Sequence, residues 1–361
     1  MPDEFAPDLD QCGHFRSGPM SSPRDVTHAH GRLTMRRLPA DDPGMAVVTR
    51  DQLEASLSEL CTHVADPRAG ILGPESVAWQ LGGDLGVFIG GGRAALLQLA
   101  HPMVAHAIDH HSRTRTDVAG RFQRTFKNVF AMVFGELDGA LIAARRVHAI
   151  HARIHGEMTG PIGGWPAGTR YHANDADALR WVHATLADTT IMVRERLDGP
   201  LPVEIKDRYM VELNRFAALF GIPRELLPDG WEAHARYMAD MLASDRLHVT
   251  PSARELGQFL FGRGADLAQP SLGRIGEAVS ASLLPPHLSR AFGLRAAPLP
   301  VRAGLAAFRA LYRQLPASVV AIPAHADARR RLLGRGPSRF AAWAEKQLFG
   351  LAHRATGQRA S

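Results

Sequence analysis

The sequence predicts an all-α protein. Helical periodicity dominates the chain from about residue 50 onward, and few runs alternate apolar and polar residues as strands do. Gly135, Gly156 and the glycine-rich run 160–164 interrupt the periodic segments where helices have to stop. The best-marked helices are predicted at 93–110, 121–134, 139–155, 177–197, 203–220 and 231–244.

Three parts of the chain differ in composition. Residues 1–45 are rich in Pro, Asp, Arg and Gly with little periodicity, which predicts a disordered N-terminal arm. Residues 46–250 carry the strongest helical pattern, so they are expected to form the main helical domain, the one in which any catalytic site would lie. Residues 251–361 are richer in Pro and Ala and are expected to form a C-terminal helical subdomain with a basic tail.

The formal charge of +6 raises the question of a nucleic-acid partner. Lys and Arg are spread over many amphipathic stretches, and no nucleic-acid-binding motif accompanies them, so no nucleic-acid partner is predicted. The densest basic cluster is near the C-terminus, and a solvated helical face explains it best. Peripheral contact with anionic lipid through this segment stays open, because apolar residues follow it. The residues concerned are Arg329, Arg330, Arg331, Arg335, Arg339, Phe340, Trp343, Leu348 and Leu351.

Localisation signals are weak. The N-terminus is acidic, and no stretch approaches the ~18 uninterrupted apolar residues of a membrane span. Cys12 and Cys61 are too few for a disulfide framework and are expected to be free thiols in a reducing compartment. We therefore expect a cytoplasmic protein, with peripheral membrane contact left open.

A glycine-rich segment, 85–95, formally matches G-x-G-x-x-A, and Asp109 lies at a suitable distance for a dinucleotide site. The residues between them read as one helix, however, where a dinucleotide fold needs a second strand. The favoured interpretation is a glycine-rich turn that leads into a buried helix. A nicotinamide-dependent reductase built on the Gly90 turn remains the third functional alternative.

Histidines are frequent in the central third of the chain, and two pairs have the i, i+4 spacing that places both rings on one helical face: His106 with His110, and His151 with His155. The spacing is common by chance. No Glu-x-x-His, His-Glu-x-x-His or Cys-x-x-Cys-His occurs, which disfavours di-iron and zinc-protease sites and predicts that any haem is bound without covalent attachment.

The helices predicted at 121–134 and 139–155 carry the strongest constellation. Arg121 and Thr125 share a face of the first helix beside apolar residues such as Phe126, and Arg145 and His148 share a stripe of the second. Haem suits this set, since its ring needs apolar walls, its iron an imidazole and its propionates Arg partners. On spacing alone, the simpler interpretation of a packed His148 and solvated arginines is favoured.

Four sequence blocks favour the haem interpretation over the simpler one. In order, they are GGGRAALLQLAHPMVAHAIDHHS, GRFQRTFKNVFAMVFG, RRVHAIHARIHG and RYHANDADALRWVHATLADT. Together they resemble the successive signatures of the catalytic domain of the MpaB and latex-clearing (rubber oxygenase) family. The resemblance extends from about residue 65 to about residue 345.

The resemblance implies a globin-like helical bundle around a pocket for one haem b. In latex-clearing members the iron ligand is the His of an Arg-x-x-His pattern, which falls on Arg145 and His148 here. An Arg and a Thr four residues apart lie on the distal side, and Arg121 and Thr125 match them. Those members have a Lys just before this Thr, where this chain has Arg124.

The expected roles follow from this match. Arg121 and Thr125 are the expected catalytic residues, and His148 is the expected iron ligand. The expected haem-binding residues are His148, Arg145, Arg124 and Phe126. Rival iron ligands are His101 and His183, followed by His106 and His111; His101 precedes Pro102, which marks a helix start or a kink.

The activity that the resemblance implies is oxidation or cleavage by dioxygen of a carbon–carbon double bond in an isoprenoid or lipid-like substrate. The expected partners are thus O₂ and a hydrophobic unsaturated small molecule, and the expected cofactor is non-covalent haem b. The alternative from another class is a non-enzymatic helical protein that binds haem or lipid.

Overall fold

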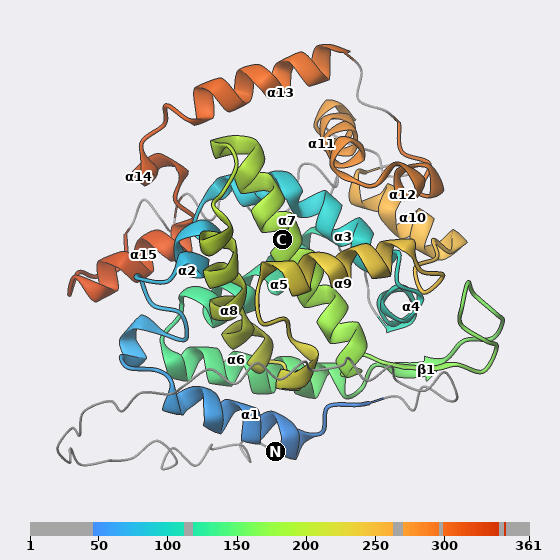
Figure 1. Ribbon diagram of the computed structural model, residues 1–361, viewed down its shortest axis with the longest axis horizontal. Coiled ribbons are helices and arrows are strands. Elements are labelled where there is room, and N and C mark those ends of the chain that lie inside the picture. Colours follow the sequence, from blue (N-terminus) through green and yellow to red (C-terminus); the bar gives the residue numbers. More distant parts are fainter. Residues whose placement is uncertain (1–45, 112–117, 263–269, 296–298, 339–342, 344–361) are drawn as a thin grey trace. The chain divides into compact units, whose positions relative to one another are not determined.

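A computed structural model describes residues 46–111, 118–262, 270–295, 299–338 and 343. The side chains of 110–111, 118–123, 270–272, 299–302 and 305 are outside this description. The described residues form fifteen α-helices, short 3₁₀ turns and one two-stranded sheet, so the prediction of an all-α protein is confirmed (Figure 1). The predicted N-terminal arm, with Cys12, lies outside the described residues.

The helices are α1 (Arg50–Thr62), α2 (Val77–Gly82), α3 (Gly91–Leu99), α4 (Pro102–His111), α5 (Val118–Phe134), α6 (Leu137–His151), α7 (Ala176–Asp198), α8 (Val203–Ala218), α9 (Trp231–Ala243), α10 (Pro251–Leu260), α11 (Pro270–Leu283), α12 (Pro286–Ala291), α13 (Leu299–Tyr312), α14 (Ala317–Val320) and α15 (Pro323–Leu332). The strands are β1 (His155–Glu157) and β2 (Arg170–His172), which pair antiparallel.

Two predicted helices need correction. The helix expected at 93–110 is split into α3 and α4. Pro102 begins α4, because a residue without a backbone N–H is tolerated in the first turn of a helix but not in its interior. The helix expected at 139–155 ends at His151, and His155 pairs with His172 in the small sheet. His151 and His155 therefore do not share a helical face.

The glycine-rich segment is a turn into a buried helix, as expected. A 3₁₀ turn at Leu85–Gly90 leads directly into α3, whose Leu96 and Leu97 are fully buried. Gly90 is required there, because an added Cβ would overlap Thr189 and Val193 of α7. Within the described part of the chain the two-stranded sheet is antiparallel, and a dinucleotide-binding fold needs parallel strands.

Helix α7 runs through the middle of the described helices and contributes to two apolar clusters (Figure 1). The first cluster joins α7 to α1, α2, α5, α6 and α8, through residues such as Ile191, Met210 and Leu137. The second joins α7 to α3, α4, α9, α10 and α12, through residues such as Trp181 and Leu97. Helix α7 is thus the common wall of both halves of the core.

The expected boundary at 250/251 crosses the second cluster, which contains Ala253 and Leu256 from α10 beside Trp181 from α7. Residues Met45–Ser361 form one compact unit. The C-terminal helices therefore share a core with the preceding ones.

Helix α15 packs against α5, and part of the basic cluster holds it there. Arg331 donates from Nε to the carbonyl of Arg68 at 3.1 Å and from Nη2 to the carbonyl of Phe134 at 2.8 Å. Arg330 donates to the carbonyl of Gly336 at 2.8 Å. These two arginines thus bond to backbone oxygens, and lipid contact through the C-terminal basic segment stays a prediction. No described helix has the length and apolar character to cross a bilayer.

Candidate functional site

Helices α5 and α6 form the frame of the candidate site. Only Gly135 and Glu136 separate them, and a connection this short makes the two helices antiparallel neighbours. At ~1.5 Å per residue, Thr125 lies about 14 Å along α5 from the connection and His148 about 17 Å along α6. The structure therefore brings Thr125 and His148 to the same end of the pair. Arg121 lies one turn further along α5, and its side chain is outside the description.

His148 is half-buried near the end of α6, and its ring is oriented by a backbone group. Its Nε2 lies 3.0 Å from the carbonyl oxygen of Val48, in the segment just before α1. A carbonyl oxygen can only accept, so Nε2 carries a proton, and in the neutral form of the ring the lone pair is at Nδ1. The main chain of His148 is also bound, because Asn174 Nδ2 donates to its carbonyl at 3.1 Å.

Arg145 lies one turn before His148 and points toward the same neighbour, α1. Its Nε and Nη2 donate to the two carboxylate oxygens of Glu54 at 2.9 and 2.8 Å, a bidentate pair. The Arg145 guanidinium holds the pKa of Glu54 below its usual range, against the opposing effect of burial. Both side chains are partly exposed, so the pair contributes modestly to stability, about 1 kcal/mol or less. Its main effect is to set the position of α1 over α6.

The expected haem-binding residues of α5 differ in their surroundings. Arg124 and Thr125 are exposed, whereas Phe126 is half-buried and contacts Phe88 and Phe130 at ring-centroid distances of 5.0 and 5.6 Å. Phe126 and Phe130 thus form an apolar row on α5, and the role of Phe126 in haem binding stays a prediction.

Burial falls along the α5–α6 pair from the connection to the His148 end. Near the connection, Phe134, Leu137 and Ala140 are buried. At the other end, Thr125 is exposed and Ile150 keeps 49% of its surface accessible. On α6 all residues from Arg145 to His151 are exposed or half-buried, so the end that carries the expected ligand and distal residues is less covered than the connection.

Further histidines lie around this end, and they do so in pairings other than those that the i, i+4 spacing predicted. The rings of His155 and His172 stack at 5.9 Å across the small sheet, and His106 of α4 lies 5.7 Å from the ring of Tyr171. Burial, and then the imidazoles of His155 and His148, hold the pKa of His172 below its usual range. The nearest signal in the sequence was the RYH run that opens the fourth of the blocks named above.

The two rival ligands are buried elsewhere. His101 lies against Trp165, with ring centroids 5.3 Å apart, and its Nδ1 has no hydrogen-bond partner. His183 of α7 is stacked on Phe216, and neither of its ring nitrogens has a partner. Burial lowers the pKa of each imidazole to about 3, so both rings are neutral at ordinary pH.

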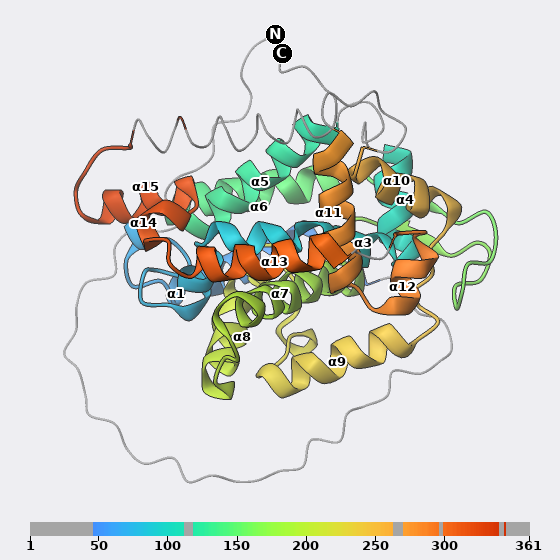
Figure 2. The same ribbon diagram turned by 90° about the horizontal axis from the view of Figure 1, so that it is seen from above.

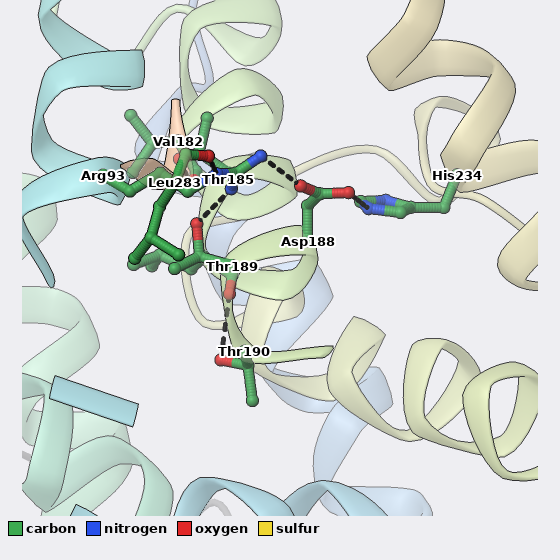
Figure 3. Close-up of polar contacts among 9 residues, drawn as sticks. Arg93, Val182, Thr185, Asp188, Thr189, Thr190, His234 and Leu283 are labelled. Carbon is green, nitrogen blue, oxygen red and sulfur yellow. Dashed lines mark hydrogen bonds and ion pairs between the residues drawn. The ribbon is translucent and has the colours of Figure 1, made fainter. Parts of the chain in front are cut away.

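A buried polar network lies in the core near His183 and is drawn in Figure 3. Arg93 of α3 is only 3% exposed and donates to Asp188 and Thr189 of α7 at 2.7 and 2.6 Å, and to the carbonyl of Leu283 in α11 at 3.0 Å. The second oxygen of Asp188 faces His234 of α9 at 3.7 Å, an ion-pair distance. Burial alone would raise the pKa of Asp188, but His234 and Arg93 hold it below its usual range. The network ties α3, α7, α9 and α11 together.

The donor set around His148 fits a haem. Iron-binding imidazoles usually donate their other ring N–H to a carbonyl or carboxylate, which fixes the ring, and His148 makes such a bond to Val48. The porphyrin supplies four nitrogen ligands to haem iron, so the iron needs no more than an axial imidazole from the protein. Within the described ranges, no three His, Cys, Asp or Glu side chains converge to hold a metal ion by themselves. Arg145 departs from the expected set, because a haem propionate would have to replace Glu54 as its partner.

Comparison with protein families identifies one match. The family model of the ER-bound oxygenase mpaB/B'/Rubber oxygenase catalytic domain matches residues 79–317, well over half of the chain. No curated protein and no solved structure matches the chain. The globin-like character expected of the bundle therefore stays a prediction, while the resemblance carried by the four sequence blocks is confirmed. The chain belongs to the MpaB and rubber oxygenase catalytic-domain family, which assigns it an oxygenase role.

Proposed function

We propose that the chain is a haem b-dependent oxygenase that cleaves or oxidises a carbon–carbon double bond of an isoprenoid or lipid-like substrate with O₂. In the cleavage reaction the double bond breaks and each carbon gains one atom of the same O₂ molecule, which gives two carbonyl groups without an external reductant. Bound haem b supplies the iron centre for this dioxygen chemistry.

One observation carries the proposal: the imidazole of His148 is fixed by Val48 with Nδ1 as its lone-pair nitrogen, at the less covered end of α5 and α6. Apolar surface at that end, including Ile150 and the half-buried Phe126, suits a hydrophobic ring and a hydrophobic substrate. The family match supports the oxygenase class, and this arrangement favours haem as the cofactor.

Each residue of the set then has a distinct part. With haem b bound, His148 would hold its iron, and Phe126 would form part of the apolar wall. The hydroxyl of Thr125, with Arg121 one turn away, would donate toward negative charge that develops on oxygen during the reaction. Arg124, which is exposed, would pair with a haem propionate, and Arg145 positions α6 through Glu54 unless a propionate displaces that carboxylate.

Haem binding is tested by the absorption spectrum and haem content of His148→Ala. We expect the reduced Soret band of the wild type to be lost, with the far-ultraviolet circular dichroism unchanged. The matched control is His287→Ala, at an exposed position of α12, which should keep the wild-type spectrum. Full haem occupancy with an unaltered spectrum in His148→Ala would refute this ligand, and the same measurement on His101→Ala and His183→Ala then identifies the rival.

Catalysis is tested by oxygen uptake with an unsaturated terpenoid such as squalene. Thr125→Ala should retain haem and lose about tenfold in rate, the effect of one hydrogen bond made in the transition state. A wild-type protein that binds haem but consumes no oxygen with any unsaturated terpenoid would instead support the non-enzymatic haem-binding alternative.

A further inference from the structure

Helices α13 and α14 and the turn between them expose apolar side chains. Leu311 is 61% exposed, Val319 57%, Phe308 42% and Leu315 38%. The other exposed large apolar residues of the described chain are scattered over helices and loops, whereas these four fall within residues 308–319. A concentration of this kind marks an interaction surface rather than ordinary scatter.

The helix is attached to the core by polar contacts. Tyr312 donates to Asp84 at 2.5 Å, and Arg309 Nε donates to the carbonyl of Leu197 at 3.3 Å. At 100° per residue, the face opposite these two side chains carries Ala303, Ala307 and Leu311, all exposed. Helix α13 lies at the outer edge in Figure 1 and nearest the viewer in Figure 2, so the side of the helix away from the core points outward.

Charge around this face has one sign. Residues 278–326 contain five arginines and neither Asp nor Glu. Arg309 and Arg313 are exposed on α13 itself and directly after it. The carboxylates nearest the attachment point, Asp84 and Asp198, are both paired with Arg194, at 2.8 and 2.5 Å. Arginine beside exposed leucine and phenylalanine is the pattern of a helix that lies in the headgroup region of an anionic bilayer.

We propose that the outer face, the exposed side of residues 303–319, docks on an anionic phospholipid surface. Leu311 and Leu315 enter the boundary between headgroups and acyl chains, and Arg313 contacts lipid phosphates. The contact needs no insertion of a spanning helix. It is independent of haem binding at His148, so either proposal can fail without the other.

The test is sedimentation of the full chain with vesicles of phosphatidylcholine alone and of an equal mixture with phosphatidylglycerol, at low and high salt. We expect binding to the anionic vesicles, weakened by salt because exposed charges are screened. The double variant Leu311→Gln with Leu315→Gln should bind at least about tenfold more weakly, because glutamine gains much less free energy than leucine when it leaves water. The control is Val211→Gln on α8, whose exposed fraction of 49% is comparable, and it should bind as the wild type does.

Three results overturn the proposal. They are absence of wild-type binding to anionic vesicles, equal binding to neutral vesicles, and a double variant that binds as the wild type does. The main competing hypothesis is that the outer face binds a second copy of the chain, which sedimentation equilibrium tests. If the wild type dimerises but does not bind vesicles, and the double variant is monomeric, the outer face is a dimer interface.

Discussion

Gly83, at the end of α2, is predicted to be a position where one added methyl group destabilises the docking of α15. Its φ of −81° and ψ of 0° suit alanine, so the backbone does not demand glycine. A Cβ at Gly83 would lie 2.5 Å from Cδ2 and 2.6 Å from Cγ of His325. The ring cannot move aside easily, because it packs on Trp79 at 4.0 Å and Phe134 at 5.4 Å between centroids.

The magnitude of the effect comes from two opposing contributions. Overpacking of this kind lowers the free energy of unfolding by about 1–3 kcal/mol. The lower conformational entropy of the unfolded alanine variant raises it by about 0.4–1 kcal/mol. Gly83→Ala should therefore lower the free energy of unfolding by about 1–2 kcal/mol, measured by urea denaturation. Gly82→Ala is the matched control, because a Cβ at Gly82 would meet nothing within 4 Å. This substitution should stabilise the helix by about 0.5–1 kcal/mol.

A double-mutant cycle isolates the cause. If the imidazole is the obstacle, Gly83→Ala should cost much less in a His325→Ala background, since the colliding atoms are gone. An unchanged cost in that background, or equal effects of Gly82→Ala and Gly83→Ala, would refute the reasoning.

Two further predictions concern buried charge. The pKa values of His101, His183 and His325 lie at about 3, 3 and 4, below the ordinary 6.5, and that of Asp175 at about 6, above the ordinary 3.8. Between pH 4 and 6 the unfolded chain therefore binds three more protons at the imidazoles and one fewer at Asp175, so stability should fall by roughly 2–3 kcal/mol per pH unit on acidification. Urea midpoints that are flat from pH 7 to 5 would contradict this. Asp188→Asn should cost about 3–5 kcal/mol, because it leaves the Arg93 guanidinium buried without its counter-ion, whereas Asp198→Asn on the exposed end of α7 should cost under about 1 kcal/mol. Equal losses of thermal stability in these two variants would show that the buried ion pair contributes no more to stability than the exposed one.

The helix pair α5–α6 could be predicted from sequence because its apolar periodicity is strong and its connection is marked by Gly135. The split between α3 and α4 was missed although Pro102 was visible, since an apolar pattern can continue across a break in the backbone. The early end of α6 was missed for another reason. His155 leaves the helix because it pairs with β2, a contact that periodicity does not encode.

Part of the placement of the candidate site was predictable, while the roles of its residues stay predictions. His148 and Thr125 come to one end of the helix pair because both helices are regular and antiparallel. The hydrogen-bond partners of His148 and Arg145 could not be predicted from the sequence. Val48 and Glu54 are 100 and 91 residues away from them, respectively. The network around Arg93 was likewise hidden, since a buried ion pair between α3 and α7 leaves no periodic signal.

The gradient of burial along α5 and α6 separates positions that support the fold from positions that support the chemistry. At the connection, Phe134 packs on Trp79 and His325 and receives a hydrogen bond from Arg331 at its carbonyl. Changes there expose apolar surface and break long-range contacts, so they reduce the free energy of unfolding. At the other end, Thr125 is exposed and contributes little to packing, so its replacement should leave stability unchanged. A residue that affects haem or oxygen uptake without affecting unfolding therefore belongs to the site itself, and the proposed function requires such residues at the Thr125 end of the pair and not at the Phe134 end.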